Sequence, residues 1–337
     1  MAIRTPLCDL LGIDVPIGSA GMAGGHATAR LAAAVSNAGG LGGLGGIYRE
    51  GPARLREEIR RTRELTSKPF SVNLWCFLLD QAPQFLDVCI EERAPSVTLS
   101  FGAPGGHARR AKEAGLLVLH QVQTVVGARA AAAAGVDVII AQGGEAGGHT
   151  GSVATMALVP QTVDIAGGIP VIAAGGIADG RGLVAALALG AQGVIMGTRF
   201  VAAEESMSQP RHRERILAAT ADDTVYTDVF DVVDDMTWPQ GISGRTIRTP
   251  FADEWHGREA ELAEQRAAIL AESPVPDEAP ERAQSAYAGQ SAGLVRDVKP
   301  AAVIIADIMR EAEANISRLH VMRLDYAMRQ SIREYYS

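Results

Sequence analysis

Apolar and polar residues alternate along residues 1–203 in a repeating unit of one short apolar run and one longer amphipathic stretch. The short runs are bounded by Gly or Pro and are rich in Val, Ile and Ala, which is typical of parallel strands buried on both faces. The longer stretches carry apolar residues at helical spacing, and proline at position 160 is taken to start one of the helices. The predicted strands span residues 15–18, 41–47, 70–75, 96–101, 116–122, 136–142, 170–174 and 193–196, and the predicted helices span 27–38, 52–65, 81–93, 106–114, 124–134, 160–166 and 179–189.

Eight strands that alternate with helices are the number found in a (β/α)8 TIM barrel. The predicted fold class is therefore α/β, with residues 1–203 forming the barrel. An open, doubly wound sheet is the alternative, because alternation alone does not show whether the sheet closes. In a barrel, the side chains that carry chemistry lie at the carboxyl ends of the strands.

The regular alternation stops after residue 203. Residues 204–289 are irregular, with a predicted hairpin around residues 226–231 and a stretch rich in Pro and Glu at residues 272–281. We interpret residues 204–289 as an insertion or cap region.

Residues 290–337 are interpreted as a segment that returns to the barrel, followed by a C-terminal helix over residues 301–336. The helix is expected to pack on the barrel or on a second subunit, so a homodimer is compatible with the sequence. The residues expected to recur on its apolar face are Val303, Ile304, Ile308 and Met309.

Composition narrows the class of protein. With 47% hydrophobic residues in 337, the chain can bury a large core. A net charge of −8 argues against a nucleic-acid partner. Three cysteines without a C-x-x-C pair are typical of a reducing compartment. Because the sequence shows neither the apolar core of a signal peptide nor a long uncharged apolar run, we expect a cytoplasmic enzyme with a small-molecule substrate and no membrane partner.

The segment Gln142-Gly-Gly-Glu-Ala-Gly-Gly-His149-Thr-Gly151 directly follows the predicted strand 136–142. Glycine lacks a Cβ atom and allows the backbone to approach a flat or anionic ligand closely. The imidazole of His149 is suited to proton transfer near neutral pH. The alternative is a glycine-rich surface loop with a solvated histidine.

A second pair of glycine-rich turns follows the last two predicted strands. Gly175 and Gly176 come after strand 170–174, and Gly197 and Thr198 come after strand 193–196. In barrels these two loops commonly form a phosphate site. The glycine N–H groups and the Thr198 hydroxyl would hold the phosphate without a cationic side chain, whereas the alternative is a pair of tight turns.

Other features have more than one interpretation. Residues 40–45 match G-x-G-x-x-G, but a helix precedes the glycines, so we predict close packing of helix and strand rather than a dinucleotide site. Asn73 ends a strand, where its amide can bond to a ring system, or it is a turn residue. The histidines lack metal-ligand spacing, and no metal site is expected.

Together, these segments resemble the nitronate monooxygenase family, formerly called 2-nitropropane dioxygenases. The resemblance covers residues 1–205 well and 204–289 weakly. Ser291-Ala-Gly-Leu-Val295 also resembles a late segment that returns to the active site. The matching stretches are residues 16–22, 34–41, 69–73, 142–151, 173–181 and 186–198.

The resemblance implies a TIM barrel that binds FMN noncovalently. It implies oxidation of alkyl nitronates by O2 to a carbonyl compound and nitrite, through one-electron transfer to the flavin. His149 would be the catalytic imidazole, removing the α-proton of a nitroalkane or stabilising the anionic nitronate, and Ser291 would face the substrate. The residues that would contact FMN are Gly21, Met22, Asn73, Gln142, Gly147, Gly175, Gly176, Met196, Gly197 and Thr198.

The resemblance also leaves alternatives. FMN-dependent enoyl-thioester reductases, which use NAD(P)H, share this barrel and a similar Glu-x-Gly-Gly-His segment, and NADH:quinone reductases share the barrel. Some relatives have a Lys near the end of the fifth strand where this chain has His120 and Gln121, which removes a fixed positive charge. An FMN-binding sensor is the non-enzymatic alternative.

Overall fold

Eight parallel strands form one sheet whose neighbours follow the order β1-β9-β8-β6-β5-β4-β3-β2. The computed structural model describes residues 3–275 and 279–336, with side chains up to residue 322. Gly18 on the first strand of this order pairs with Leu41 beside the last, and this contact closes the sheet into a barrel. The predicted (β/α)8 fold is confirmed, and the open sheet is excluded. The barrel strands are β1 (Ile17–Ser19), β2 (Gly42–Gly45), β3 (Phe70–Trp75), β4 (Ser96–Ser100), β5 (Leu117–Val122), β6 (Val138–Gln142), β8 (Val171–Ala174) and β9 (Gly193–Met196).

Helices surround the barrel, and most lie within a few residues of their predicted positions. The prediction for Pro160 was wrong, because the helix begins at Thr155 and contains the proline. Met156, whose carbonyl loses its helical donor at Pro160, is 67% exposed and open to solvent. The barrel helices are α1 (Pro6–Leu11), α2 (Ala29–Asn37), α3 (Pro52–Leu65), α4 (Cys76–Leu79), α5 (Gln84–Glu91), α6 (Gly105–Glu113), α7 (Val125–Ala133), α8 (Thr155–Ile165), α9 (Gly180–Ala188) and α10 (Thr198–Val201).

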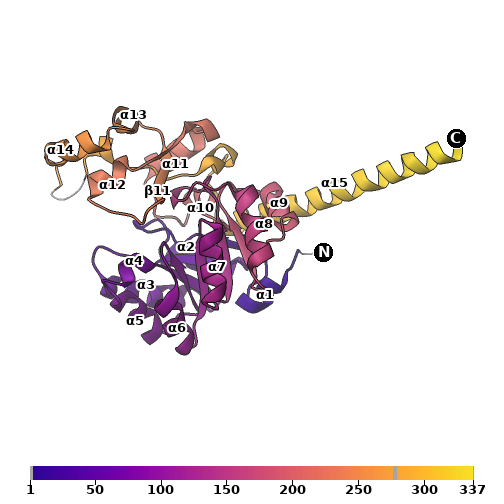
Figure 1. The fold of residues 1–337 in the computed structure, drawn as a ribbon, viewed down its shortest axis with the longest axis horizontal. Helices are drawn as coiled ribbons and strands as arrows, with labels where there is room; N and C mark the ends of the chain where they lie inside the picture. Colours follow the sequence, from indigo (N-terminus) through magenta and orange to yellow (C-terminus); the bar gives the residue numbers. More distant parts are fainter. Residues whose placement is uncertain (1–2, 276–278, 337) are drawn as a thin grey trace.

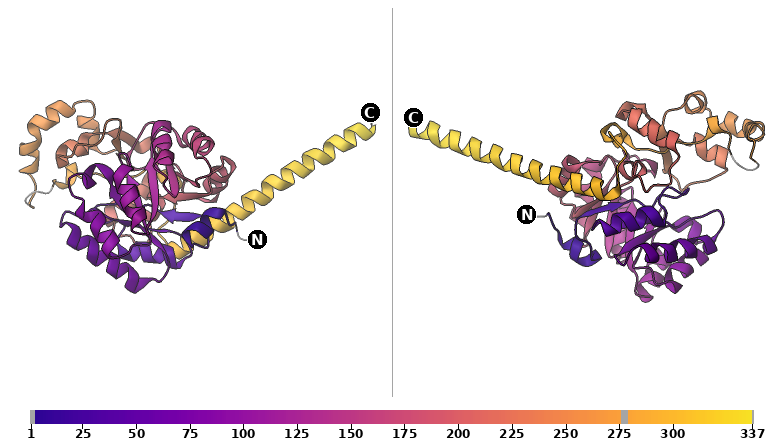
Figure 2. Two further views of the ribbon diagram at one scale, coloured as in Figure 1. Left: turned by 60° about the horizontal axis from the view of Figure 1, so that its bottom comes forward. Right: turned by 180° about the vertical axis from the view of Figure 1, so that it is seen from behind.

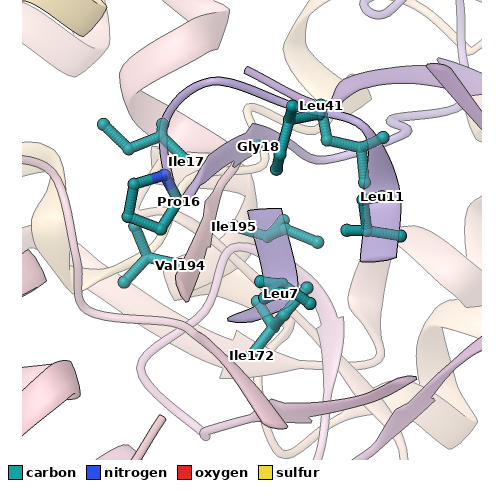
Figure 3. Close-up of a pocket in the computed structure, with 10 residues that line it drawn as sticks. Leu7, Leu11, Pro16, Ile17, Gly18, Leu41, Ile172, Val194 and Ile195 are labelled. Carbon is teal, nitrogen blue, oxygen red and sulfur yellow. The ribbon is translucent and has the colours of Figure 1, made fainter. Parts of the chain in front are cut away.

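The inside of the barrel is filled with side chains, as alternation along the strands requires. Leu119, Ile140 and Ile195 point inward and pack with Leu7 and Leu11 of α1. Helix α1 thus plugs the amino-terminal end and leaves a cavity of only about 10 Å³ beside it (Figure 3). Such a volume holds at most about one water molecule, so this cavity is too small for a substrate or a cofactor.

The glycines of residues 40–45 allow α2 to lie directly on β2. A Cβ atom on Gly42 would sit 1.9 Å from the carbonyl oxygen of Ala32 on α2, and one on Gly40 would sit 3.3 Å from the Val35 side chain on the same helix. These contacts confirm that the glycines serve close packing of helix and strand.

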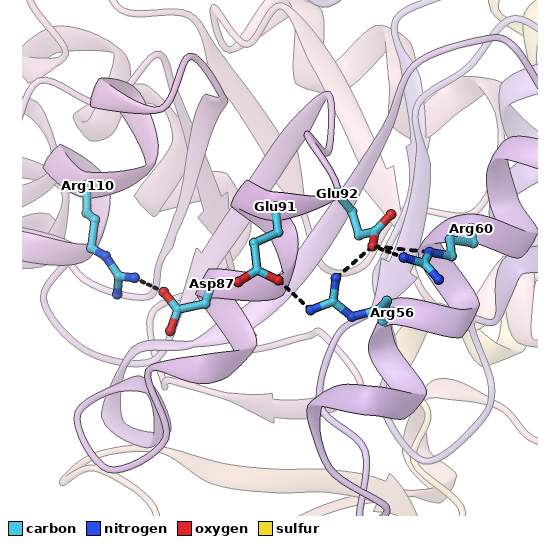
Figure 4. Close-up of polar contacts among 6 residues, drawn as sticks. All are labelled: Arg56, Arg60, Asp87, Glu91, Glu92 and Arg110. Carbon is cyan, nitrogen blue, oxygen red and sulfur yellow. Dashed lines mark hydrogen bonds and ion pairs between the residues drawn. The ribbon is translucent and has the colours of Figure 1, made fainter.

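Ion pairs connect the outer helices α3, α5 and α6 (Figure 4). Arg56 binds both Glu91 and Glu92, and the Arg60 guanidinium lies 2.8 Å from Glu92. Hydrogen bonds from Arg60 and Arg56 lower the pKa of the Glu92 carboxyl. Because most of these side chains are exposed, we expect the cluster to contribute little to stability.

The segment between Val201 and η3 (Gln290–Leu294) folds over the carboxyl end of the barrel as a cap with its own apolar core (Figure 1). The predicted hairpin at residues 226–231 was wrong, because β10 leads into a helix and pairs antiparallel with β11 instead. The cap elements are α11 (Pro210–Ala218), η1 (Ala221–Asp223), β10 (Thr224–Thr227), α12 (Val229–Asp234), β11 (Ser243–Ile247), α13 (Pro250–Trp255), α14 (Glu259–Leu270) and η2 (Glu281–Ala283).

The C-terminal helix α15 (Ala301–Tyr336) packs its first turns against α2 and α9 and then projects from the barrel (Figure 2). The predicted apolar face was partly wrong, because Val303 is 41% exposed. The buried face consists of Ala301, Ile304, Ile305, Ile308, Met309 and Ala312. None of the helices within the described residues is long and apolar enough to cross a membrane.

Candidate active site

His149 lies on a short strand rather than in a loop. Strand β7 (Gly148–Thr150) pairs antiparallel with β11 of the cap, and His149 is opposite Gly244. The three-stranded sheet has the order β10-β11-β7. A strand of three residues whose partner is more than 90 positions away leaves no local sequence pattern, so the sequence did not predict it. The cap backbone therefore fixes the segment that carries His149.

The cap also supplies a carboxylate to the imidazole. The Nε2 atom of His149 lies 2.8 Å from Oδ1 of Asp231 on α12, and both side chains are about nine-tenths buried. Because a carboxylate only accepts hydrogen bonds, Nε2 carries a hydrogen. Among the described residues, Nδ1 has no hydrogen-bond partner. The Asp231 contact thus leaves the Nδ1 lone pair available to take a proton.

An indole covers one face of the same imidazole. The ring of Trp238 stacks on His149 with centroids 3.5 Å apart and planes inclined by 13°. Its Nε1–H donates to Oδ1 of Asp231 at 3.1 Å. Tyr287 lies on another side, 5.3 Å from His149 between ring centroids, and burial raises the pKa of its hydroxyl. Asp231, Trp238 and Tyr287 were missed by sequence reasoning, because no motif in the cap marks them.

Gln142, predicted to contact the flavin, organises the loop before His149. Its Oε1 accepts hydrogen bonds from Gln121 and Gln123, at 3.0 and 2.9 Å. Its Nε2 donates to the carbonyl of His149 at 3.2 Å. The side chain therefore connects the ends of β5 and β6 to the histidine segment, and one amide hydrogen remains for a ligand.

Asn73, also predicted to face the flavin ring, connects β1 to β4. Its Nδ2 donates to the carbonyl of Gly21 at 2.7 Å, and its Oδ1 accepts from the hydroxyl of Ser100. A Cβ atom on Gly21 would lie 2.6 Å from Cβ of Asn73. Asn73 thus holds the loop of Gly21 and Met22 against the barrel end.

The turns after β8 and β9 present backbone donors without protein acceptors. Within the part of the chain that the structure describes, the N–H groups of Gly176, Gly197 and Thr198 donate to no protein atom. The Thr198 hydroxyl oxygen accepts from the N–H of Gly289 at 2.9 Å, which leaves its own hydrogen free to donate. Gly176 and Gly197 are half-buried and Thr198 is buried, and unpaired donors in such positions fit a phosphate.

The donors of Gly176, Gly197 and Thr198 form a phosphate cradle, and Gly197 leaves the most room in it. An added Cβ atom would meet only the Ala20 and Met22 side chains, at the ordinary distance of 3.7 Å. Gly175 and Gly176 instead have φ values of +97° and +73°, which side-chain-bearing residues rarely adopt. The residues present therefore fit a phosphate group beside Gly197.

The remaining predicted residues pack around the site and hold its backbone segments together. A Cβ atom on Gly147 would lie 2.4 Å from the backbone nitrogen of Gly289, so this glycine accommodates the returning segment. Ser291 lies in η3 and is only 5% exposed. Met196 ends β9 with its side chain in the core between strands and helices, and its carbonyl accepts from Ala20.

His120 does not take part in the site. It is 2% exposed on β5 and, by strand alternation, faces the helices, whereas Gln121 faces the barrel interior. Burial lowers the pKa of His120 to about 4, which keeps the ring neutral. At the end of β5 the uncharged Gln121, rather than His120, is therefore the side chain that can face the site.

Comparison with known proteins relates this geometry to a family. A family model described as nitronate monooxygenase matches residues 4–88 and 77–311 of the chain. A probable nitronate monooxygenase of Staphylococcus saprophyticus is 37% identical, in a match that covers 68% of this chain and 77% of the relative.

Two further similar proteins are not named as nitronate monooxygenases. The (3aS,4S,5R,7aS)-5-hydroxy-7a-methyl-1-oxo-octahydro-1H-indene-4-carboxyl-CoA dehydrogenase of Mycobacterium tuberculosis is 41% identical, covering 75% of this chain and 69% of the relative. The solved structure of FabK from Thermotoga maritima superimposes with a TM-score of 0.84 at 42% identity, covering 95% of this chain and 99% of that one.

Proposed function

The chain belongs to the nitronate monooxygenase family and is a flavin-dependent oxidoreductase. We propose that it uses FMN to oxidise alkyl nitronates, and nitroalkanes, with O2 to a carbonyl compound and nitrite. The sensor alternative is not pursued, because the matched relatives are named as a monooxygenase and a dehydrogenase.

One observation carries the proposal. His149 offers Nδ1 at the carboxyl end of the barrel, while Asp231 binds Nε2 at 2.8 Å. A histidine oriented by a buried carboxylate is an effective proton acceptor, because the carboxylate stabilises the imidazolium that forms. A nitroalkane requires such a base, since its α-proton must leave before the nitronate can be oxidised.

The cofactor would bind through its phosphate to the N–H groups of Gly176, Gly197 and Thr198 and to the Thr198 hydroxyl. Bound FMN would supply the one-electron chemistry that joins nitronate oxidation to O2. The chain's own contribution is to orient the substrate, to exclude water and to move the α-proton at Nδ1 of His149.

Replacement of His149 by alanine tests the proton transfer. A nitronate is already deprotonated, so the variant should lose activity by roughly 10²–10⁴-fold with neutral nitroalkanes and far less with preformed nitronates. The measurement is nitrite release from ethyl nitronate and nitroethane, with bound flavin determined by absorbance. Parent rates with both substrate forms would refute the catalytic assignment, and loss of flavin would show that His149 is structural.

Anaerobic mixing tests the reaction class. The visible absorbance of the FMN-loaded protein should change when it is mixed with ethyl nitronate without O2, and the oxidised-flavin spectrum should return on admission of O2, with release of nitrite. Bleaching by NADPH or NADH alone, with no response to nitronates, would overturn the proposal.

A second candidate is oxidation or reduction of an acyl thioester next to its carbonyl. The observation that favours it is the 41% identity to a dehydrogenase named for a CoA thioester. The α-carbon of a thioester is also acidified by its neighbour, so Nδ1 of His149 could transfer a proton there. An enoyl-CoA assay with NAD(P)H distinguishes this candidate, and a quinone acceptor in the same assay tests the NADH:quinone reductase alternative.

A further inference from the structure

Aromatic side chains surround His149 at the carboxyl end of the barrel. Two of the three tryptophans in the chain lie here. The aromatic side chains come from the ends of β3 and β4, from α4, from the cap loop between α12 and β11, and from the segment that precedes η3. This aromatic cage consists of Trp75, Phe77, Phe101, Trp238 and Tyr287.

The indole of Trp238 occupies the centre of the cage. Its ring centroid lies 4.9 Å from that of Trp75, 4.9 Å from Phe101 and 5.3 Å from Phe77. It also stacks on the imidazole of His149, with ring centroids 3.5 Å apart. A flat, apolar group the size of an indole therefore fits between the barrel aromatics and the proton-accepting imidazole.

The barrel side of the cage is held in a strained conformation. Phe101 has a φ of +56°, which bulky residues rarely adopt. Its carbonyl accepts a hydrogen bond from the N–H of Phe77 at 3.3 Å, which joins two members of the cage through their backbones. Strained residues of this kind concentrate at ligand-binding positions, so the site maintains these rings at a conformational cost.

The cap side of the cage is easier to move. Trp238 lies in the loop between α12 and β11, and Met236 and Gln240 near it are exposed. The only side-chain hydrogen bond that the structure gives its indole is the one to Asp231. Trp238 can thus leave the cage without any change in a barrel strand, and its departure uncovers one face of His149.

We propose that Trp238 is a specificity-determining lid. A planar or branched apolar group of the substrate takes the place of its indole, and Trp238 then closes over that group. The substrate is accordingly a carbon acid attached to a ring or to a bulky apolar group, rather than a short alkyl chain. This inference rests on the proposed function for the role of His149, but its binding step can be measured separately.

Steady-state turnover measures the preference for a bulky apolar substrate over a short alkyl one. The FMN-loaded parent, Trp238→Ala, Trp238→Phe and Met236→Ala proteins are compared on nitroethane and 1-nitro-2-phenylethane. Trp238→Ala should lower the kcat/KM ratio of the phenyl compound to nitroethane by roughly 10-fold or more, mainly through KM, because a lost apolar contact discriminates to that extent. Trp238→Phe should retain most of the preference. Met236→Ala, on the same loop, should match the parent. An unchanged ratio in Trp238→Ala overturns the proposal.

Binding of a ligand that is not turned over tests the Trp238 lid separately from the proposed nitronate oxidation. 1-Naphthoate is titrated into the same proteins and followed by flavin absorbance and tryptophan fluorescence. The parent should show a saturable fluorescence change that is smaller in Trp238→Phe, where only Trp75 remains in the cage, and the Kd should rise in Trp238→Ala. If naphthoate binds in this way while no nitroalkane is oxidised, the proposed function fails and the lid stands. Equal Kd values in all four proteins overturn the lid even where nitronates are oxidised.

Discussion

At the scale of the residue, Gly197 offers a test of the phosphate cradle that does not depend on strain. Its Cβ direction is open, and its φ is −96°. Gly197→Ala should therefore fold normally, with a stability change within about 1 kcal/mol. The added methyl group would occupy the space of the phosphate, so FMN affinity should fall by roughly 10-fold or more. The measurements are thermal unfolding of the apoprotein and titration with FMN.

Gly176→Ala serves as the contrasting variant, because its positive φ and the 3.3 Å approach to Cβ of Glu145 make it strained as well. It should lose both stability and flavin. If Gly197→Ala binds FMN as the parent does, the phosphate lies elsewhere.

His120 predicts a dependence of stability on pH. Burial lowers its pKa to about 4, whereas the unfolded chain has a value near 6.5. A lowered histidine pKa means that the unfolded state takes up the proton first. The contribution of the neutral ring to the free energy of unfolding is complete above about pH 6.5. It is lost as the pH falls to 4, which lowers the free energy of unfolding by about 3 kcal/mol. His212, also lowered to about 4 by burial, adds to the same trend.

Denaturant unfolding between pH 7 and 4 measures this effect. His120→Leu should lose less free energy of unfolding over that range than the parent. His320→Gln, at an exposed position on α15, should follow the parent curve. Parallel curves for the parent and His120→Leu would contradict the prediction.

Residue by residue, the position of a side chain in the fold was predictable from the sequence where the residue follows a strand end. His149, Gly176, Gly197 and Thr198 follow barrel strands, so their place at one end of the barrel was predictable. Asp231 was not, because it reaches His149 only through the fold of the cap, 82 positions away. A contact that depends on tertiary structure leaves no spacing in the sequence.

At the scale of the element, α15 has two parts with different roles. Its first turns bury Ile304 and Ile308, whereas Ile316, Leu319 and Met322 are 42%, 52% and 61% exposed. A chain that ends after Ser317 should keep its thermal midpoint within about 2 °C, since surface changes contribute little. Ile308→Asp should lower the midpoint strongly by placing a charge in the buried face.

The same truncation tests the expected homodimer. If the projecting part of α15 covers a second subunit, the shortened chain should elute as a smaller species in size-exclusion chromatography. Elution of both forms at the monomer volume would contradict the expectation.

Among the elements, the barrel strands were the most predictable because a run buried on both faces has a strong apolar pattern. The start of α8 was misplaced because proline was given its usual position at the first helical residue. Strand β7 was missed because glycine and histidine have no strand preference, and its stability comes from pairing with β11.

At the scale of the whole molecule, the barrel provides glycine backbone and the cap provides the groups that control His149. The barrel architecture follows from local alternation and was predicted. The way the cap lies over the barrel follows from long-range contacts, such as the bond from Nε of Arg245 to the carbonyl of Gly144 at 2.8 Å. No property of a single segment indicates such a contact, so the cap was only outlined from the sequence.

The pairing of β7 with β11 has a consequence for evolution and for engineering. A graft that brings in the cap of a relative replaces the strand beside His149, the carboxylate on its Nε2 and the indole on its face in a single step. Substrate range and proton-transfer geometry are therefore inherited together. Exchange of caps between relatives should generate new activities in one recombination event, whereas single substitutions in the glycine turns after β8 and β9 should change cofactor affinity and leave substrate choice intact.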